Sequence, residues 1–278
     1  MVFSGREAPK GPRLDLAVMD DEASRDEWAP TWDDEANDPM SRPEVVDPVV
    51  DFLAERAGRG PVLELGIGTG RIALPLAARG VEVHGIDLSE EAVGRLRAKP
   101  GGAGIPVTMG DFATTFVDGR PFTLAYLVFN TIMNLTTQEE QVACFRTVAA
   151  QLVPGGCFVI ETMVPDLRRL PPGEVIKPYH FSEERWGLDE YDIANQGLRS
   201  HHVVFRDGKM DYSSGQFRYV WPSELDLMAE LAGMRLRERW DGWTREPFTS
   251  ESRQHVSVWD KPGSSHPRAP IAYPGART

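Results

Sequence analysis

Three glycines at alternate positions stand in the run PVLELGIGTG (residues 61–70), behind an apolar segment that contains one carboxylate. Glycine permits a sharp turn and a close approach of the backbone to a ligand, and a helix that begins there offers free N–H groups. Dinucleotide-binding sheets use the spacing GxGxxG and place a pyrophosphate at the helix end. Here Gly66, Gly68 and Gly70 are spaced GxGxG, and Glu64 would repel a pyrophosphate but attract an amino or sulfonium group. The pattern favours S-adenosylmethionine over NAD; a tight turn without a ligand is the alternative.

Two aspartates follow where a nucleoside would need them. Asp87 ends an apolar run 17 residues after Gly70, and a carboxylate at that place accepts two hydrogen bonds from a ribose diol. Asp111 ends a later run in the sequence GDF, where it can accept from an adenine amine while Phe112 packs on the ring. A single aspartate of this kind is often only a turn former. Their joint placement indicates a ligand site, because the carboxyl ends of parallel strands meet at one edge of a sheet.

The elements that must position these residues follow from alternating apolar runs and amphipathic stretches. The pattern predicts helices over residues 45–58, 69–80, 89–99 and 137–153, with Ser89 as an N-cap and Thr137 and Glu140 as a capping box. It predicts apolar strands over residues 61–66, 81–87, 105–111, 122–130 and 157–164. Unbroken apolar strands between helices are typical of an α/β fold with a parallel sheet covered on both faces.

The rhythm changes after Pro165. Residues 188–221 alternate between polar and apolar positions and are interrupted at 195–197 and 207–208, which is typical of antiparallel strands joined by hairpins. A helix over residues 223–233, capped by Ser223, and strands over 234–243 and 253–260 complete the predicted elements. We therefore expect an N-terminal arm (1–40), a core (41–165 and 222–260), an antiparallel insert (166–221) and a flexible tail (261–278).

Taken together, ELGIGTG, GID, GDF, VFN and LVPGG leading into FVIE resemble the class I S-adenosylmethionine-dependent methyltransferases. The resemblance implies a Rossmann-like, seven-stranded, mostly parallel sheet with helices on both faces. The insert is similar to that of small-molecule methyltransferases, including those that dimethylate amino sugars. Pro75 is a departure, because a proline inside the predicted first helix is tolerated only in its first turn. The cofactor-binding residues implied by the resemblance are Glu64, Gly66, Gly68, Thr69 and Gly70 for the methionine side, Asp87 and Leu88 for ribose, Asp111 and Phe112 for adenine, and Phe129 and Asn130 for the floor beneath the methionine moiety.

Methyl transfer makes few demands on side chains, because the donated methyl group is already activated. The protein must align the acceptor and exclude water, and a base is needed only where an alcohol or phenol must lose its proton. Alternation places His201 and His202 on opposite faces, so only one of them faces inward. Taken singly, each of these histidines is more often a surface or structural residue than a base. The candidate catalytic residues are Tyr179, His180 and His202, and the candidate acceptor-binding residues are Trp28, Asn134 and Asp166.

Trp28 and Trp32 lie in an acidic stretch, Asp15 to Asp38, which contains ten acidic residues and one basic residue. Two tryptophans in such a stretch need a surface to pack on. N-terminal segments of the resembled family often fold over the cofactor as a lid, which would place Trp32 at the cofactor. Packing of the arm on the sheet or on a partner subunit is the alternative, and a homodimer is compatible with it.

Composition narrows the class of protein. The chain has 278 residues, 41% of them hydrophobic, which suits a globular fold with a sizeable core. The net charge of −12 argues against non-specific binding to nucleic acid or anionic lipid. We expect buried thiols at Cys144 and Cys157, no metal site, no signal peptide or membrane span, and a cytoplasmic protein.

The predicted function is therefore methyl transfer from S-adenosylmethionine to an O, N or C atom of a small molecule, in specialised metabolism. An amino-sugar N-methyltransferase is an alternative within this class. A nicotinamide-dependent oxidoreductase belongs to another class and is disfavoured by Glu64 and the glycine spacing. A non-catalytic protein that binds S-adenosylmethionine is a third possibility, because binding motifs and chemistry are separable.

Overall fold

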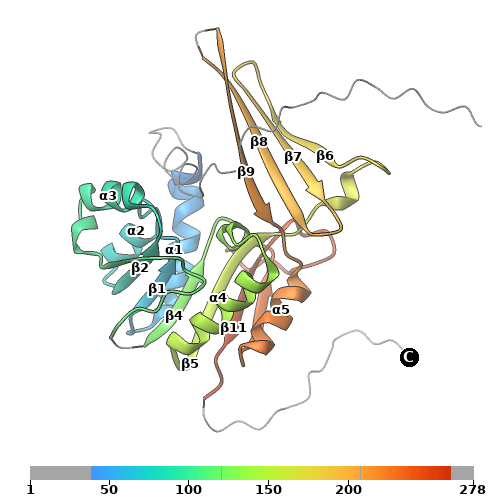
Figure 1. Ribbon diagram of the computed structural model, residues 1–278. Helices are drawn as coiled ribbons and strands as arrows, with labels where there is room; N and C mark the ends of the chain where they lie inside the picture. The colour runs from blue at the N-terminus through green and yellow to red at the C-terminus, as the bar shows by residue number, and fades with distance from the viewer. Residues whose placement is uncertain (1–38, 120, 207, 264–278) are drawn as a thin grey trace, which may run out of the picture.

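The structure is a computed structural model that describes residues 39–119, 121–206 and 208–263 (Figure 1). Trp28, Trp32 and most of the predicted tail lie outside the described residues. The α-helices are α1 (Pro43–Ala57), α2 (Ala73–Ala78), α3 (Glu90–Ala98), α4 (Gln138–Gln151) and α5 (Pro222–Leu231). Short 3-10 helices are η1 (Pro39–Ser41), η2 (Gly102–Gly104), η3 (Thr131–Asn134) and η4 (Leu167–Arg169). The strands are β1 (Val62–Leu65), β2 (Val83–Asp87), β3 (Val107–Met109), β4 (Phe122–Leu127), β5 (Leu152–Met163), β6 (Ile176–Phe181), β7 (Arg185–Asp192), β8 (Gly197–Arg206), β9 (Lys209–Arg218), β10 (Arg235–Trp240) and β11 (Gln254–Asp260).

The core is one seven-stranded sheet in the order β10-β11-β5-β4-β1-β2-β3. The five strands from β5 to β3 pair in parallel, whereas β11 runs antiparallel to β5 and β10 antiparallel to β11. Strand order reverses direction beside β1, so the carboxyl ends of β1, β2 and β4 border the crevice where open α/β sheets bind ligands. The predicted Rossmann-like, mostly parallel sheet is confirmed.

Helices cover both faces of this sheet. Alternate residues of the central strands pack against α1, α2 and α3 on one face, including Val62, Leu124 and Val159. Their neighbours in sequence, such as Leu63 and Phe158, pack against α4 and α5 on the other. Figure 1 shows α4 and α5 side by side in front of the sheet. Burial on both faces explains why these strands lack polar alternation.

The insert is a separate four-stranded antiparallel sheet in the order β6-β7-β8-β9. It stands above the end of β5 in Figure 1. The turns that the sequence predicts are present, with Gln196 at φ 59° and Gly208 at φ 72°. The sheet begins at Ile176, earlier than the alternation predicts, because β6 is an exposed edge strand that contains Pro178 and has no buried face to impose a period of two.

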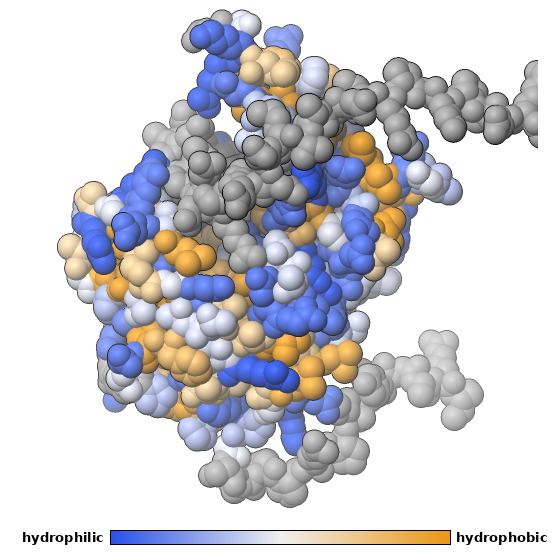
Figure 2. Space-filling model, viewed as in Figure 1, coloured by the Kyte–Doolittle hydropathy of each residue, from blue (hydrophilic) through white to orange (hydrophobic). Residues whose placement is uncertain are grey.

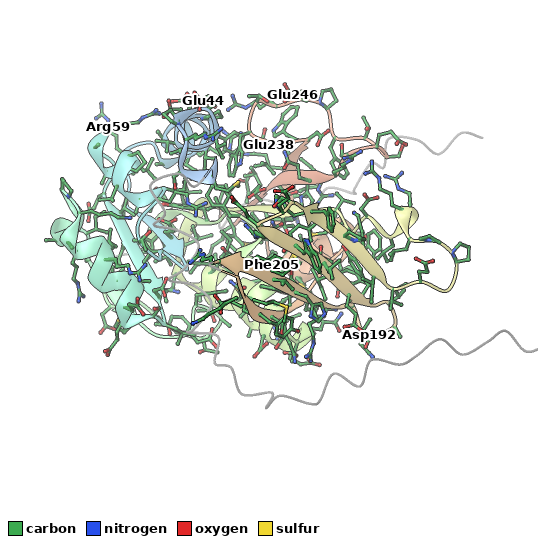
Figure 3. All side chains as sticks on the ribbon, turned by 90° about the horizontal axis from the view of Figure 1, so that it is seen from above. Glu44, Arg59, Asp192, Phe205, Glu238 and Glu246 are labelled. Carbon is green, nitrogen blue, oxygen red and sulfur yellow. The ribbon has the colours of Figure 1, made fainter. Side chains whose placement is uncertain are left out.

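The far end of the insert carries exposed apolar side chains. Phe181 is stacked on Trp186, with ring centroids 5.5 Å apart, and Phe205 meets Trp186 edge to face. Hydrophobic colour appears on the β6–β7 side of the insert in Figure 2. In the view from above, Phe205 lies near the middle of the molecule and Asp192 near its periphery (Figure 3).

Most of the predicted local signals are confirmed. The Ser89 hydroxyl accepts the Ala92 N–H, and Thr137 and Glu140 form the capping box. Pro75 falls in the first turn of α2, where its missing N–H costs nothing. Cys144 and Cys157 are both buried.

The prediction that Ser223 caps the last helix is wrong. Trp221 is the N-cap residue, no side chain caps α5, and Pro222 occupies its first turn. Proline has the backbone angle of a helix start already fixed, so α5 begins two residues earlier than an N-cap at Ser223 would place it.

A polar network fastens the insert to the core. The buried Arg218 of β9 donates to Gln141 Oε1 at 2.5 Å and to Glu224 Oε1 at 2.7 Å. The Gln141 amide in turn donates to the carbonyls of Ile132 and Leu135, which flank the end of η3. The base of the insert is thus tied to α4, to α5 and to the loop that follows β4.

Candidate active site

The glycine loop links β1 to α2 at the carboxyl edge of the sheet. Gly66, Gly68 and Gly70 have φ values of 71°, 53° and 82°, all in the left-handed region that favours glycine. A Cβ atom at Gly66 would lie 2.9 Å from the Thr131 side chain, so this position has no room for a larger residue. Thr69 is 1% exposed, and its hydroxyl has no hydrogen-bond partner within the described structure. The loop is therefore a close-fitting backbone cradle with one unsatisfied polar atom.

Asp87 ends β2 beside this loop. Its carboxylate accepts the Gly68 N–H at 2.6 Å and the Ser89 N–H at 2.9 Å. The two bonds hold the carboxylate in place and tie the tip of the glycine loop to the end of β2. Leu88, the next residue, is 45% exposed at this edge, which is unusual for a leucine between a buried strand and a helix.

Asp111 and Phe112 follow β3 on the same edge. Asp111 accepts the Ala113 N–H at 2.8 Å, which fixes a turn. Phe112 is buried, and its ring lies near Gly66. Met109, at the end of β3, is exposed. Apolar side chains and carboxylates therefore lie along the same edge of the sheet, from β1 to β3.

Glu64 lies within β1 and is buried together with Tyr126 of β4. The Tyr126 hydroxyl donates to Glu64 Oε2 at 2.9 Å. Burial, with the neighbouring carboxylate as a second cause, raises the pKa of Tyr126 well above its usual value. Tyr126 therefore stays protonated and keeps Glu64 oriented beneath the glycine loop.

The loop after β4 has an unusual backbone. Phe129 and Asn130 have φ values of 53° and 62°, so two consecutive residues other than glycine adopt the left-handed region. Such conformations are costly and persist only where surrounding contacts enforce them. The Phe129 N–H donates to Glu161 Oε2 at 2.5 Å, and Asn130 Oδ1 accepts the Met163 N–H at 2.7 Å. The loop is pinned to β5 from both residues.

A second group of polar side chains lies on one face of the insert. The Tyr179 hydroxyl is 2.8 Å from Nδ1 and 3.0 Å from Nε2 of His202. Ser200 Oγ is 3.2 Å from His202 Nε2 and donates to Asp189 Oδ1 at 2.8 Å. Gly187 pairs with His202 in the sheet, and its missing side chain leaves the space that the Tyr179 ring fills. We call Tyr179, Asp189, Ser200 and His202 the insert cluster.

The insert cluster faces the core. Strand alternation puts Ser200 and His202 on the same face as Leu198, and Asp189 on the same face as Tyr191. Leu198 and Tyr191 pack into the core beside α4 and α5, so the cluster lies farther along that core-facing surface. His201 points to the opposite face, where it contacts Tyr212 and Glu190, as the alternation predicts.

The ionisation of the cluster follows from its burial. Burial first, then the Arg185 guanidinium and His201, lower the pKa of His202 to about 4. Burial likewise raises the pKa values of Tyr179 and Asp189 above their usual range. At neutral pH His202 is therefore a neutral imidazole. Because Arg185 donates to His202 Nδ1 at 3.2 Å, the proton of the neutral ring is assigned to Nε2.

The remaining predicted residues are more scattered. Asp166 forms ion pairs with Arg169 at 3.0 Å and Lys177 at 3.2 Å, near the junction of β5 and the insert. Asn134 is exposed at the end of η3. His180 is exposed on β6, next to Tyr179 but outside the contacts of the insert cluster. Trp28 and Trp32 lie outside the described residues.

Four residues that lie in these two sites or contact them are absent from the sequence prediction: Tyr126, Glu161, Asp189 and Ser200. Ser200 could have been found, because it is two positions from His202 on one predicted strand and must share its face. Asp189 required the hairpin register. Tyr126 and Glu161 required the order of the strands, since each contacts a residue far away in sequence.

The residues at the sheet edge fit an S-adenosylmethionine molecule. The unsatisfied Thr69 hydroxyl, the glycine cradle, the oriented carboxylates and the exposed Leu88 match the mixed polar and apolar surface of a nucleoside amino acid. Two cavities, of about 210 and 420 Å³, are lined by other residues: one lies between α1 and Trp243, the other between Asp166 and Arg253. Within the described ranges, no group of three or more His, Cys, Asp or Glu side chains could hold a metal ion. The described helices include none long and apolar enough to cross a membrane.

Comparison with known proteins agrees with this geometry. A family model described as a methyltransferase domain matches residues 62–156. The solved structure of the CcbJ methyltransferase from Streptomyces caelestis is 36% identical, covers 84% of this chain and 96% of its own, and superposes with a TM-score of 0.74. The cypemycin N-terminal methyltransferase of a Streptomyces species is 25% identical over 72% of this chain and 82% of its own length. A ubiquinone biosynthesis O-methyltransferase of Sinorhizobium medicae is 30% identical over 41% of this chain and 49% of its own length.

The match to the methyltransferase domain covers the glycine loop and both edge aspartates, and the fold that carries them is the one the sequence predicts. The chain therefore belongs to the class I S-adenosylmethionine-dependent methyltransferases.

Proposed function

We propose that this enzyme methylates an amine nitrogen of a small polar molecule in specialised metabolism. The acceptor would lie between the carboxyl edge of the core sheet and the core-facing side of the insert, residues 166–221. The observation that carries the choice of nitrogen is the insert cluster, in which a neutral His202 is hydrogen-bonded to Tyr179. An amino-sugar acceptor is one member of this class.

The cofactor is assigned to the edge residues described above. Asp87 and Leu88 would hold the ribose, Asp111 and Phe112 the adenine, and the loop Glu64–Gly70 the methionine side. Phe129 and Asn130 would lie beneath the methionine moiety. When bound there, S-adenosylmethionine supplies a methyl group that is already activated toward a nucleophile.

The task left to the chain is to orient the acceptor and exclude water. The Tyr179 ring is partly exposed, so its hydroxyl oxygen can accept an N–H from a molecule above the sheet edge. His202 and Ser200 contact that hydroxyl at 2.8 and 3.4 Å, and Asp189 accepts a hydrogen bond from Ser200 at 2.8 Å. The cluster is thus a preorganised set of hydrogen-bond acceptors with little freedom to move.

The ionisation of the cluster supports nitrogen over oxygen. A phenol or alcohol must lose a proton during transfer, and a phenol has an ordinary pKa of about 10. His202, with a pKa of about 4, is too weak a base to take that proton efficiently. An amine that arrives unprotonated needs no base before transfer, only acceptors for its N–H groups. The name of the cypemycin enzyme, which matches most of the chain, also points to an amino group as acceptor.

The test uses matched acceptors. The full-length protein and S-adenosylmethionine are incubated with hydroxylated amines, including amino sugars and peptide N-termini, and with the same scaffolds carrying a hydroxyl in place of the amine. Mass spectrometry locates any added methyl group. We expect methylation of amines only, with Tyr179→Phe reducing turnover while S-adenosylhomocysteine affinity stays unchanged.

Methylation of the hydroxyl scaffolds at comparable rates would contradict the nitrogen assignment. Binding of S-adenosylhomocysteine without turnover on any acceptor would instead favour a non-catalytic binding protein. Asp87→Ala is the matched control for the cofactor site, because it should abolish turnover through lost cofactor affinity rather than through the insert.

A further inference from the structure

Glu161 is a buried carboxylate outside both groups of residues that hold the cofactor and the acceptor in the proposal above. It lies near the end of β5 and is 8% exposed. Burial raises its pKa to about 7, although the Phe129 N–H acts in the opposite direction. A carboxyl group in such surroundings is expensive to bury and needs a reason for its presence.

Its contacts are with the strained loop after β4. Glu161 Oε2 accepts the Phe129 N–H at 2.5 Å, and the main-chain oxygen of Glu161 accepts the Asn130 N–H at 3.3 Å. These are the two residues with consecutive left-handed φ values of 53° and 62°. A backbone of this kind relaxes unless its N–H groups are held, so Glu161 supplies part of the constraint.

The Phe129–Asn130 segment and its neighbour Thr131 also contact the glycine loop. The guanidinium of Arg71, which directly follows Gly70, lies 4.7 Å above the centre of the Phe129 ring. On the other side, the Thr131 methyl group closes the space above Gly66. The position of the Phe129–Asn130 backbone therefore decides how closely this loop and the glycine loop approach each other.

We propose that Glu161 is a positioning residue for the methionine end of the cofactor, acting through the Phe129 amide. The inference rests on the proposed placement of Phe129 and Asn130 beneath the methionine moiety. The feature that matters is a side-chain oxygen at residue 161 that lies within hydrogen-bonding distance of the Phe129 N–H.

Two conservative variants separate the effect of the length of the Glu161 side chain from the effect of its charge. Glu161→Gln keeps an oxygen at the same distance and loses the charge. Glu161→Asp keeps the charge and withdraws the oxygen by one methylene. Calorimetric titration with S-adenosylhomocysteine should show affinity within about twofold of wild type for Gln and about tenfold weaker for Asp, the scale of one lost hydrogen bond. Ser257→Ala, a buried polar change on the neighbouring strand β11, is the matched control and should bind like wild type.

A double-mutant cycle with Phe129→Gly tests the path of the effect. Glycine adopts the left-handed conformation without strain, so the loop no longer needs the tether. The loss caused by Glu161→Asp should shrink from about tenfold to less than about threefold in the Phe129→Gly background. A purely structural role would leave the loss unchanged in both backgrounds.

Several outcomes would overturn the inference. They are wild-type affinity in Glu161→Asp, an equal loss in Glu161→Gln, and a full loss that persists beside Phe129→Gly. Failure of the proposed cofactor site looks different: Asp87→Ala would then bind as well as wild type, or wild type would not bind S-adenosylhomocysteine at all.

Discussion

The burial of Glu161 predicts how the stability of this enzyme depends on pH. The perturbation is Glu161→Gln, which removes one titrating group and keeps the hydrogen-bond acceptor. The folded-state pKa is raised from 4.5 to about 7, so the folded chain holds a proton that the unfolded chain releases between these values. Stability from this group is fully present below the unfolded pKa and is lost as pH rises through the folded pKa.

The magnitude follows from the size of the shift. A shift of about 2.5 pKa units corresponds to about 3 kcal/mol, because each unit is worth about 1.4 kcal/mol. Integrating the two titrations places about 2 kcal/mol of this loss between about pH 5.5 and pH 8. Little discount for solvent screening is needed, because the side chain is 8% exposed.

The assay is urea denaturation of the wild type and Glu161→Gln at several pH values in this window. All other groups titrate alike in both proteins, so the difference between their free energies of unfolding isolates Glu161. We expect the variant to gain about 2 kcal/mol relative to wild type as pH rises from about 5.5 to 8. A difference that is flat with pH, or that moves the other way, would refute the reasoning that burial dominates at this site.

Three further predictions address the cofactor site, the insert and its cluster. Asp87→Ala should weaken S-adenosylhomocysteine binding by about a hundredfold in calorimetry, since it removes the proposed acceptor of two ribose hydroxyls and the acceptor of the Gly68 N–H at 2.6 Å. A change below about threefold would contradict the proposal. Arg218→Met should cost about 3 kcal/mol in urea denaturation because it strands Glu224 in a half-buried site, and Arg218→Met with Glu224→Leu should recover part of that loss. The lowered pKa of His202, about 4, means that its stabilising contribution is present above pH 6.5 and is lost as pH falls toward 4; His202→Gln should flatten this part of the thermal unfolding profile, and an unaltered profile would count against a neutral, buried imidazole.

Features that depend on neighbouring residues in the chain are the ones that the sequence predicts best. A tight turn at Gly66, Gly68 and Gly70 could be predicted because positive φ values favour glycine. All three residues have positive φ values. The position of Asp87 at the edge of the sheet could be predicted because the end of a parallel strand is a fixed place in an α/β sheet. The helix starts at Ser89 and Thr137 were predictable for the same reason, since a cap contacts only residues two or three positions away.

The sequence was weaker where partners are distant. Glu64 and Tyr126 are 62 positions apart in the sequence, and Glu161 and Phe129 are 32 positions apart. Each pair meets because its strands are neighbours in the sheet, which no local pattern reveals. The start of the insert at Ile176 was also hidden, because an exposed edge strand has no buried face to impose alternation. The wrong prediction at Ser223 has a local cause. Pro222 and Ser223 both favour a helix start, and the helix begins at the proline.

By itself, then, the sequence determined the fold class, the cofactor and the residues along the edge of the core sheet, because periodicity, turn chemistry and strand ends are properties of short segments. Only the tertiary structure decided which side chains of the insert meet and how they ionise. Tyr179, Asp189, Ser200 and His202 come from three strands, and strand register brings them within hydrogen-bonding distance. The pKa shifts of Tyr179, Asp189 and His202 arise mainly from burial, which depends on the packing of several strands and is not encoded in any one of them.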